Sequence, residues 1–413
     1  MADRRVVVTG LGVISPVGCN VETFWDNLVN GVCGIAPIEG MPMPVAAKVA
    51  GQVKDFDPVA QGLNKNDIRR SDKFSQFATA ASIQAIAQSG LVSGENIEPE
   101  RIGVYIGSGI GGIDTFIAQT KVMFEEGSER VSPLFIPTMI ANIAGGNVAI
   151  KYNLQGPSLT TVAACATSTN SVGEAYRAIR HGYADAIVTG GSETVVNPLA
   201  IGSFANAKAL SMSDDPKTAC RPFDLNRNGF VMGEGAGILV LEEYEHAKAR
   251  GAEILAEVTG YGNTCDAHHV TAPRPDGIPA SRAISMALEQ SGYAGEDLYI
   301  NAHGTSTHLN DLTETKAIKL ALGEELARKA SISSTKSMTG HMLGATGAVE
   351  LIASVLALKN GIIPPTIGLT DPDPECDLDY TPLKARRRDV KFAISNSLGF
   401  GGHNACVALK KYE

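Results

Sequence analysis

The chain has 413 residues, 44% of them hydrophobic and 19% charged, and is therefore long enough to bury two core-forming units. Its formal net charge of -9 argues against general nucleic-acid binding. Seven cysteines without paired spacing predict a reducing compartment without disulfides, and the lack of CxxC and HExxH sequences gives a zinc site no support. The chain enters a strand-like run at once and no apolar run is expected to reach membrane-spanning length, so we expect a cytoplasmic protein without a leader peptide or a membrane contact.

The order of the predicted elements repeats once along the chain. The first unit contains, in order, a strand at 5–12 (RVVVTGLG), a helix at 77–90, a strand at 101–109 and a helix that ends at 182. The second unit contains a strand at 255–262 (LAEVTGYG), a helix at 281–292, a strand at 297–305 and a helix that ends at 361. Two such units predict a layered α/β structure with helices on both faces of each sheet. We place the boundary near residue 254, between halves 1–254 and 255–413, and expect a shared core because no Pro- or Ser-rich linker separates them.

One cysteine lies where a strand-like run gives way to a helix. In GPSLTTVAACATSTNSVG (residues 156–173), small and β-branched residues precede Cys165, and helical spacing of apolar residues follows it. At a helix N-terminus, unpaired backbone N–H groups and the helix dipole stabilise an anion, so we expect a lowered thiol pKa. The alternative is a small buried hydrophobic residue, which is what most lone cysteines are.

Two histidine motifs favour the reactive interpretation. NAHGTSTHLND (residues 301–311) follows an apolar run and places His303 at a strand end, and SSTKSMTGHMLGATGAVE (residues 333–350) places His341 before an apolar helix. A cysteine and two histidines at such junctions are the equipment for thioester chemistry, a nucleophile with two hydrogen-bond donors or proton carriers. A single histidine could be a satisfied core residue, which is less plausible for two in loops of this composition.

Three other motifs invite functional interpretations that have weak support. GSGIGG (residues 107–112) and MGEGAG (residues 232–237) lack the Lys-Ser/Thr of a phosphate loop and are interpreted as close-packing glycines. NTCDAHHVTAP (residues 263–273) brings a cysteine and two histidines into one loop, but without a fourth ligand it is a poor metal site.

The motifs TVAACATS, NAHGTSTHLND, STKSMTGHMLGA and NSLGFGGHN resemble the four signature blocks of the β-ketoacyl-[acyl-carrier-protein] synthases, the condensing enzymes of fatty acid synthesis. The resemblance runs from residues 4–18 to 399–409, and within the family it is strongest to the synthase II group. It implies a five-layered αβαβα thiolase-like fold made of two pseudo-duplicated β/α halves. It also implies a homodimer, an acyl carrier protein as partner with acyl and malonyl thioesters as substrates, no metal, and no resident cofactor, because phosphopantetheine arrives on the carrier.

The resemblance assigns roles residue by residue. It makes Cys165 the nucleophile, His303 and His341 the donors to an enolate oxygen, and the backbone N–H groups of Cys165 and Phe400 an oxyanion hole, with Phe400 also a gate. It pairs Lys336 with Glu314 in a buried salt bridge that supports the histidines. Residues 110–156 are expected to line an acyl tunnel or pack a subunit interface, and His269 is expected to be structural. The expected substrate contacts are Ile110, Phe135 and Phe204 in the acyl tunnel, and Thr271, Thr305 and Thr307 along the pantetheine.

A cluster of basic residues is the candidate docking patch for the acidic carrier. Lys65, Arg69 and Arg70 lie close in sequence, next to Lys73, and Lys208 follows further along the chain. The alternative for such a cluster is a solvated helix face.

The sequence departs from the common family pattern at two positions and leaves other classes open. His308 stands where proline is usual and affects loop stiffness, and Leu398 stands where phenylalanine is usual, which leaves the packing of the gate and the chain-length preference open. The alternatives are a synthase I or polyketide ketosynthase, a thiolase, which uses a second cysteine as base, and a non-catalytic chain-length factor. Cys165 argues against the last, because such a partner lacks the nucleophile.

Overall fold

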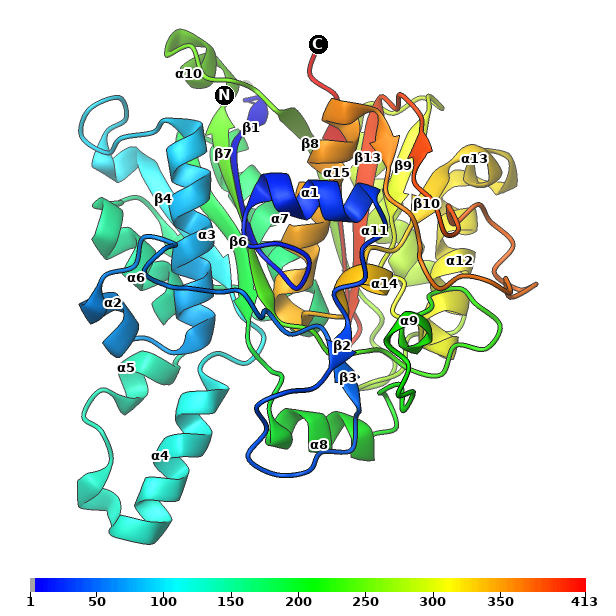
Figure 1. Ribbon diagram of the computed structural model, residues 1–413. Helices are drawn as coiled ribbons and strands as arrows, with labels where there is room; N and C mark the ends of the chain where they lie inside the picture. The colour runs from blue at the N-terminus through cyan, green and yellow to red at the C-terminus, as the bar shows by residue number, and fades with distance from the viewer. Residues whose placement is uncertain (1–3) are drawn as a thin grey trace.

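The computed structural model describes residues 4–413 and contains one ten-stranded sheet in the order β10-β9-β13-β14-β8-β1-β7-β6-β4-β5 (Figure 1). Its strands are, in chain order, β1 (Val6–Ile14), β4 (Ile102–Gly107), β5 (Ser158–Leu159), β6 (Ala186–Glu193), β7 (Gly235–Glu243), β8 (Ala256–Cys265), β9 (Leu298–Asn301), β10 (Ser331–Ser333), β13 (Phe392–Gly399) and β14 (His403–Lys410). Two short pairs lie outside it, β2 (Ala36–Pro37) with β3 (Val49–Ala50) and β11 (Ile362–Ile363) with β12 (Arg386–Arg387).

The strand order repeats from either edge of the sheet. The sequence β5-β4-β6-β7-β1 corresponds to β10-β9-β13-β14-β8, with two parallel neighbours followed by two antiparallel neighbours in each half. The halves meet where Val6–Val8 of β1 pair antiparallel with Ala256–Val258 of β8. The repetition predicted from the sequence is therefore a repetition of strand order and direction, whereas the division near residue 254 stays a prediction.

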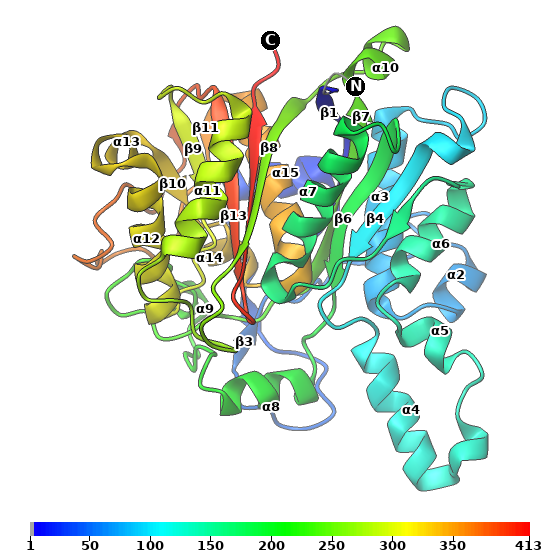
Figure 2. The same ribbon diagram turned by 180° about the vertical axis from the view of Figure 1, so that it is seen from behind.

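Helices cover and separate the two halves of the sheet (Figures 1 and 2). The α-helices are α1 (Val21–Val29), α2 (Lys65–Arg69), α3 (Lys73–Ser89), α4 (Ile113–Glu126), α5 (Phe135–Met139), α6 (Ile143–Tyr152), α7 (Thr167–Arg180), α8 (Pro198–Asn206), α9 (Pro216–Ala219), α10 (Tyr244–Ala249), α11 (Ile278–Ser291), α12 (His308–Leu322), α13 (Glu324–Lys329), α14 (Lys336–Thr339) and α15 (Thr346–Asn360). Helices α7 and α15 lie between the half-sheets, α3 and α6 cover one outer face, and α11 and α12 cover the other. The predicted αβαβα layering is confirmed.

The matching TGLG and TGYG sequences have a packing reason. A Cβ added at Gly10 of β1 would lie 2.1 Å from the carbonyl oxygen of Ala85 on α3. The equivalent atom at Gly260 of β8 would lie 2.0 Å from the carbonyl oxygen of Ala287 on α11. Each half therefore needs glycine where its outer helix approaches the sheet backbone, since any side chain would collide with it.

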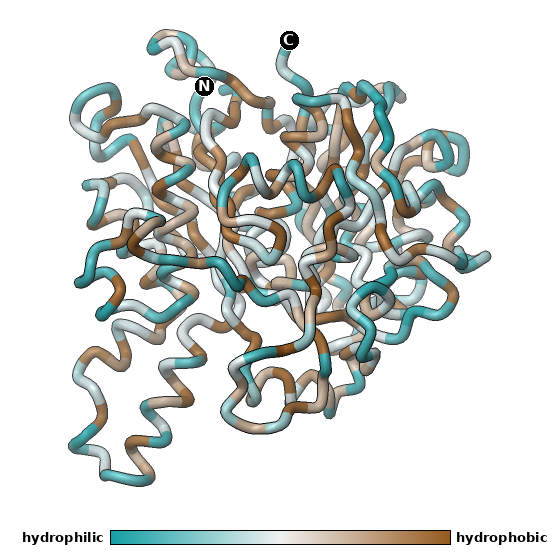
Figure 3. The backbone as a smooth tube through the Cα atoms, in the orientation of Figure 1, coloured by the Kyte–Doolittle hydropathy of each residue, from teal (hydrophilic) through white to brown (hydrophobic). Residues whose placement is uncertain are grey.

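Both halves of the chain contribute to one buried apolar core. The main cluster of buried apolar residues takes members from both halves, from Val6 to Leu409, as the lack of a linker predicted. In Figure 3, apolar segments lie mostly inside and polar ones toward the periphery. The segment Leu343–Asn360 is long and apolar enough to cross a membrane, so the expectation that no run approaches this length is wrong. The physical reason is position: 89% of this segment is buried, and a helix enclosed on all sides is apolar all round.

Candidate active site

Cys165 lies in a short turn that leads into α7. The turn, Ala164–Ala166, is a 3-10 helix, and the backbone N–H of Ala163 donates to Thr167 Oγ1 at 2.9 Å, which ties it to the first residue of α7. Gly399 packs against the turn so closely that a Cβ on it would lie 3.2 Å from the Cys165 nitrogen. The predicted position at a helix N-terminus is confirmed, and the glycine-rich segment that carries Phe400 lies directly against it.

The two histidines approach this thiol from the second half of the chain. His303 follows β9, and His341 follows α14, where its backbone N–H donates to the Val231 carbonyl at 2.7 Å. One ring nitrogen of each histidine and the Cys165 Sγ all lie within 4.8 Å of one another. The rings meet edge to face, with centroids 5.3 Å apart. Because these atoms lie so close together, one reacting group of a substrate can contact all three side chains.

An open cavity of about 400 Å³ leads to these three residues. Of the side chains expected to act in catalysis, to bind substrate, to dock the carrier protein or to set specificity, the cavity wall contains Cys165, Phe204, Lys208, Thr271, His303, Thr305, Thr307, His308, His341, Leu398 and Phe400. The rings of Phe204 and Phe400 are 6.2 Å apart, and the Thr305 and Thr307 hydroxyls are 2.9 Å apart. Both positions that depart from the family pattern, His308 and Leu398, therefore lie in this wall.

Two of the expected acyl-tunnel residues lie outside this wall. Ile110 is 41% exposed, and its backbone N–H donates to Glu193 Oε1 at 3.2 Å. Phe135 lies on α5, with its ring 6.3 Å from that of Phe116. The structure does not bring them into the cavity with Cys165, and their contact with an acyl chain stays a prediction.

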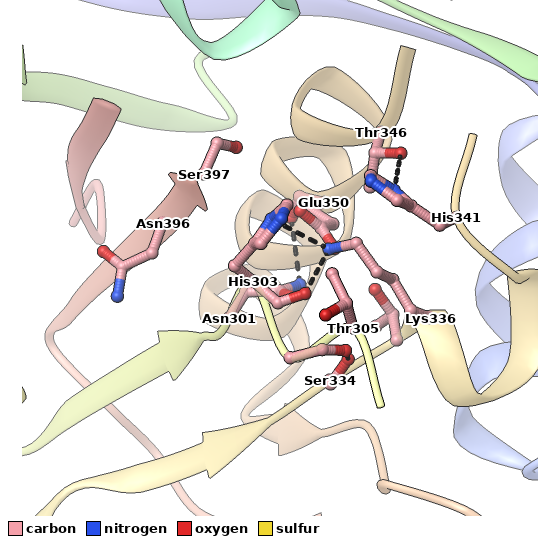
Figure 4. A network of polar contacts seen from close by, with 12 residues as sticks. Asn301, His303, Thr305, Ser334, Lys336, His341, Thr346, Glu350, Asn396 and Ser397 are labelled. Carbon is pink, nitrogen blue, oxygen red and sulfur yellow. Dashed lines mark hydrogen bonds and ion pairs between the residues drawn. The ribbon is translucent and has the colours of Figure 1, made fainter. Parts of the chain in front are cut away.

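The expected ion pair between Lys336 and Glu314 is wrong. Lys336 Nζ lies 2.5 Å from Glu350 Oε1, with both side chains almost fully buried, and also donates to the His303 carbonyl at 2.5 Å (Figure 4). Glu314 instead accepts the backbone N–H groups of His303 and Gly304, at 2.7 and 2.8 Å. The reason is the orientation of the two helices. The carboxylate of Glu350 on α15 points to the Lys336 ammonium, whereas that of Glu314 on α12 points to the backbone that follows β9. Both acids hold His303 in place. Glu314 accepts the backbone N–H of His303, and Glu350 acts through Lys336, which donates to the His303 carbonyl.

Both imidazoles are neutral near physiological pH. Burial is the main cause that lowers the pKa of His303 and of His341 well below the usual value, and the Lys336 ammonium lowers both further. Lys336 Nζ lies 3.4 Å from His303 Nδ1 and has only protons to donate, so Nδ1 is an acceptor and the His303 proton lies on Nε2. His341 Nδ1 contacts Thr346 Oγ1 at 3.1 Å. Neutral His303 can thus donate a hydrogen bond from Nε2 to a substrate oxygen.

Lys336 also affects how well Cys165, His303 and His341 could bind a metal ion such as zinc. A cysteine and two histidines at this spacing are ligand types that Zn²⁺ prefers. A metal needs a free nitrogen lone pair, but the proton on His303 Nε2 can move to Nδ1 only by facing the Lys336 ammonium. The arrangement therefore opposes metal binding and favours hydrogen-bond donation.

The expectation of a lowered thiol pKa is not supported. Burial raises the pKa of Cys165 to about 12, although Lys336 and the backbone N–H groups of Phe400 and Cys165 act in the opposite direction. A helix N-terminus contributes at most about 2 kcal/mol in partly buried sites. Moving a thiol pKa from 9 to about 12 corresponds to roughly 4 kcal/mol, so burial outweighs the dipole. The resting nucleophile is a thiol, with the two amides expected as an oxyanion hole directed at its sulfur.

Behind the histidines, four buried oxygens have no hydrogen-bond partner within the described chain. They are Asn301 Oδ1, Glu350 Oε2, Ser395 Oγ and Asn396 Oδ1. Asn301 and Ser395 are register neighbours on β9 and β13, and Asn301 Nδ2 donates to the Glu350 carbonyl at 3.3 Å (Figure 4 draws Asn301, Glu350 and Asn396). A carboxylate, an amide oxygen and a hydroxyl are ligands that a hard cation prefers. Leaving Asn301 Oδ1, Glu350 Oε2 and Ser395 Oγ unpaired is costly, so these three fit a cation, whereas Asn396 follows Ser395 on β13 and faces Glu314 on the opposite side of the sheet.

Sequence reasoning missed two buried acids of this region. Glu350 is the one charge in the apolar run at 349–358 after His341, which is a signal in itself because an unpaired charge is expensive to bury. Glu193 ends the buried strand β6 and accepts four hydrogen bonds, from Ser108 Oγ and three backbone N–H groups.

The expected docking residues are exposed but not contiguous. Lys65 and Arg69 lie on α2 and Arg70 ends it, and in residues 4–413 none of the three forms a salt bridge. Lys73 instead pairs with Glu234 at 2.7 Å. Lys208 lies in the cavity wall after α8, which Figures 1 and 2 place apart from α2.

The comparisons with known proteins agree with this geometry. Residues 3–247 match the β-ketoacyl synthase N-terminal domain and residues 255–370 the β-ketoacyl synthase C-terminal domain. The chain is 49% identical over 413 residues to 3-oxoacyl-[acyl-carrier-protein] synthase 2 of Staphylococcus aureus strain COL, covering 100% of this chain and 99% of that protein. It is 51% identical over 416 residues to the protein of the same name from Synechocystis sp., with the same coverage.

Solved structures extend the comparison to the whole fold. A ketosynthase solved with its type II polyketide acyl-carrier protein matches with a TM-score of 0.92 at 35% identity, covering 100% of both chains. A β-ketoacyl synthase from Burkholderia phymatum matches with a TM-score of 0.91 at 34% identity, over 99% of this chain and 100% of that one. The layered fold and the Cys-His-His site define a thiolase-like condensing enzyme. Within that class, the chain belongs to the β-ketoacyl synthase family.

The raised pKa of Cys165 predicts the pH dependence of its alkylation. Because the thiol stays protonated until the pH approaches a pKa of about 12, the rate of modification by iodoacetamide should still be rising at the highest pH at which the protein stays folded. Intact mass of wild type and Cys165→Ala separates this thiol from the other cysteines. A rate that levels off near neutral pH would instead show that the helix N-terminus dominates.

The unpartnered oxygens predict stabilisation by a small cation. The unfolding temperature should be higher in potassium or sodium chloride than in an equal concentration of choline chloride, since a cation at ten times its dissociation constant adds about 1.4 kcal/mol. Ser395→Ala removes one ligand and should shrink the difference. Equal unfolding temperatures in all three salts would show that no cation binds there.

Proposed function

We propose that this protein is a 3-oxoacyl-[acyl-carrier-protein] synthase that elongates fatty acyl chains by two carbons. The observation that carries the proposal is the meeting of Cys165 Sγ with nitrogens of His303 and His341, all within 4.8 Å, at the end of an open cavity. The relatives of about 50% identity over the full chain carry the same activity in their names.

The first half-reaction loads the acyl chain onto Cys165. Its sulfur attacks the carbonyl carbon of an acyl-carrier thioester, the bond from that carbon to the carrier sulfur breaks, and the thiol proton goes to the departing carrier thiolate. The developing oxyanion is stabilised by the backbone N–H groups of Cys165 and Phe400, which are directed at the sulfur. A high thiol pKa is compatible with this step because the proton is passed on as the bond forms.

The second half-reaction makes the carbon nucleophile. The malonyl thioester loses CO2, the electron pair moves onto the thioester oxygen as an enolate, and the enolate carbon attacks the acyl-Cys165 carbonyl. Breaking the acyl–sulfur bond returns the Cys165 thiolate, which takes a proton from the medium. Neutral imidazoles, as burial favours for His303 and His341, stabilise the enolate by donating N–H hydrogen bonds and carry no charge of their own that would hold the malonyl carboxylate back.

The carrier protein is the proposed partner, and cofactor chemistry enters only through it. Thr305 and Thr307 in the cavity wall offer hydroxyls to the pantetheine amides, with Thr271 near the entrance. The exposed cations of α2 suit an acidic protein. Family membership and the proposed activity also favour the cytoplasm as the compartment.

We further infer that the working protein is a homodimer. Exposed apolar side chains gather on α4, α5 and α6, including Phe124 at 80% and Ile150 at 81% exposure, and β5 leaves one edge of the sheet unpaired. A face of this kind is normally covered by another chain. Sedimentation equilibrium measures this directly as the mass of one or two chains.

A polyketide ketosynthase is the second candidate, because the fold is shared at 35% identity with the ketosynthase of a type II polyketide system. The full-length identity of about 50% to fatty acid synthases favours the first candidate. Leu398 and His308 in the cavity wall are the residues that set this protein apart from the common pattern.

Release of CO2 tests the function. With acyl-carrier and malonyl-carrier, the wild-type protein should release one CO2 for each 3-oxoacyl-carrier formed, whereas a thiolase releases none and a non-catalytic partner forms no product. Cys165→Ala should lose acylation and product but keep part of the malonyl decarboxylation, since His303 and His341 are intact. Product formation at the wild-type rate by this variant would show that another residue is the nucleophile.

Charge reversal on α2 tests the docking surface. Arg69→Glu with Arg70→Glu should raise the Michaelis constant for acyl-carrier substrates and flatten its salt dependence, while turnover of acyl-pantetheine stays nearly unchanged. Lys384→Glu with Arg387→Glu reverses two other exposed charges and serves as the matched control. Equal losses with carrier and pantetheine substrates would mean that Arg69 and Arg70 support the fold rather than the partner.

A further inference from the structure

Glu193 is a fully buried acid that the mechanism above does not use. It ends β6, and its two carboxylate oxygens accept four hydrogen bonds. Oε1 accepts from Ser108 Oγ at 2.8 Å and from the Ile110 N–H at 3.2 Å. Oε2 accepts from the N–H groups of Gly109 and Gly344, at 2.8 and 3.1 Å. Burial raises the pKa of this carboxyl to about 7, against the effect of these donors, so its position is kept at an energetic cost.

The four donors come from both halves of the chain. Ser108, Gly109 and Ile110 follow β4, whereas Gly344 lies in the turn Leu343–Ala345 at the start of α15. The two segments are in close contact, since a Cβ on Gly344 would lie 2.5 Å from the Gly109 nitrogen and 2.6 Å from Glu193 Oε2. Glu193 therefore occupies a glycine-packed junction where it is the shared acceptor of both segments.

Both segments lead directly to the catalytic residues. Gly344 is three residues from His341, and the turn it belongs to is followed directly by Thr346, whose hydroxyl contacts His341 Nδ1. On the other side, a Cβ on Gly109 would lie 3.8 Å from the carbonyl oxygen of Ala164, the residue before Cys165. The Glu193 carboxylate thus connects the backbone at Gly109, beside Cys165, with the turn Leu343–Ala345, which lies between His341 and Thr346.

We propose that Glu193 is a positioning residue for the condensation, holding the His341 turn and the segment after β4 in one arrangement around Cys165. The inference rests on the proposed synthase function. Only an acceptor with two oxygens serves all four donors, because glutamine would turn an NH2 group toward two of them. A displacement of about 1 Å at a catalytic group can cost about a hundredfold in rate.

Glu193→Gln should therefore lower kcat for condensation by roughly tenfold to a hundredfold. The Michaelis constant for malonyl-carrier should stay within about twofold, since Glu193 and its four donors are not themselves part of the cavity wall. The measurement is steady-state product formation well below the unfolding temperature of the variant.

Glu242→Gln is the matched control for lost stability. Glu242 is equally buried and accepts from Thr9, Arg250 and His246, but it lies at the far end of β7, beside α10 (Figure 1). It should lose stability while keeping kcat within about threefold of wild type. Equal kcat values for the two variants would overturn the proposal.

Ser108→Ala decides the question if Glu193→Gln does not fold. It removes one donor to Glu193 and the acceptor of the Gly111 N–H, and it leaves the three N–H groups that Glu193 accepts. A threefold to tenfold fall in kcat with an unchanged Michaelis constant for malonyl-carrier is expected, of the order of one or two hydrogen bonds. An unchanged kcat would overturn the proposal. The wild-type assay is run first, because absence of CO2 and product there would disprove the synthase function itself, independently of Glu193.

Discussion

The buried ammonium of Lys336 is the constraint on which the active site depends. It contacts Glu350 and the carbonyl of His303 at 2.5 Å each and the ring of His303 at 3.4 Å, so one charge connects α14, α15 and the end of β9. A buried pair of this kind adds little net stability, and removing one partner leaves the other charge unpaired. Its contribution here is to the state of His303: it adds to burial in lowering the pKa of the ring, places the ring proton on Nε2 and opposes metal binding.

The duplicated fold explains why the catalytic groups meet. Cys165 precedes α7 and His341 precedes α15, and these are the equivalent central helices of the two halves. His303 follows β9, whose equivalent β4 is followed by the segment that Glu193 holds. Equivalent positions in the two halves therefore have different functions. The first half supplies the nucleophile Cys165, and the second supplies His303 and His341, which stabilise the enolate.

Much of this arrangement could be predicted from the sequence, because short-range patterns encode it. The repeated TGLG and TGYG strands, the small residues around Cys165 and the two histidine motifs each carry their signal within a few residues. Other properties depend on distant parts of the chain. Which acid faces Lys336 is decided by how α12 and α15 are oriented, and the pKa of Cys165 by burial under residues far away in sequence. The positions of Ile110 and Phe135 depend on segments without a periodic pattern.

Helix α15 has a consequence for how the chain is made. Its apolar surface is covered partly by β13 and β14, which lie some 30 to 50 residues later in the chain. A ribosome that adds about 5–20 residues per second would leave this segment uncovered for several seconds, while the first half is already complete. During that interval the nascent chain displays a stretch apolar enough to pass for a membrane span. The central helix that joins the two halves of the finished enzyme is thus an apolar segment that stays partly uncovered until the last two strands of the sheet have been made.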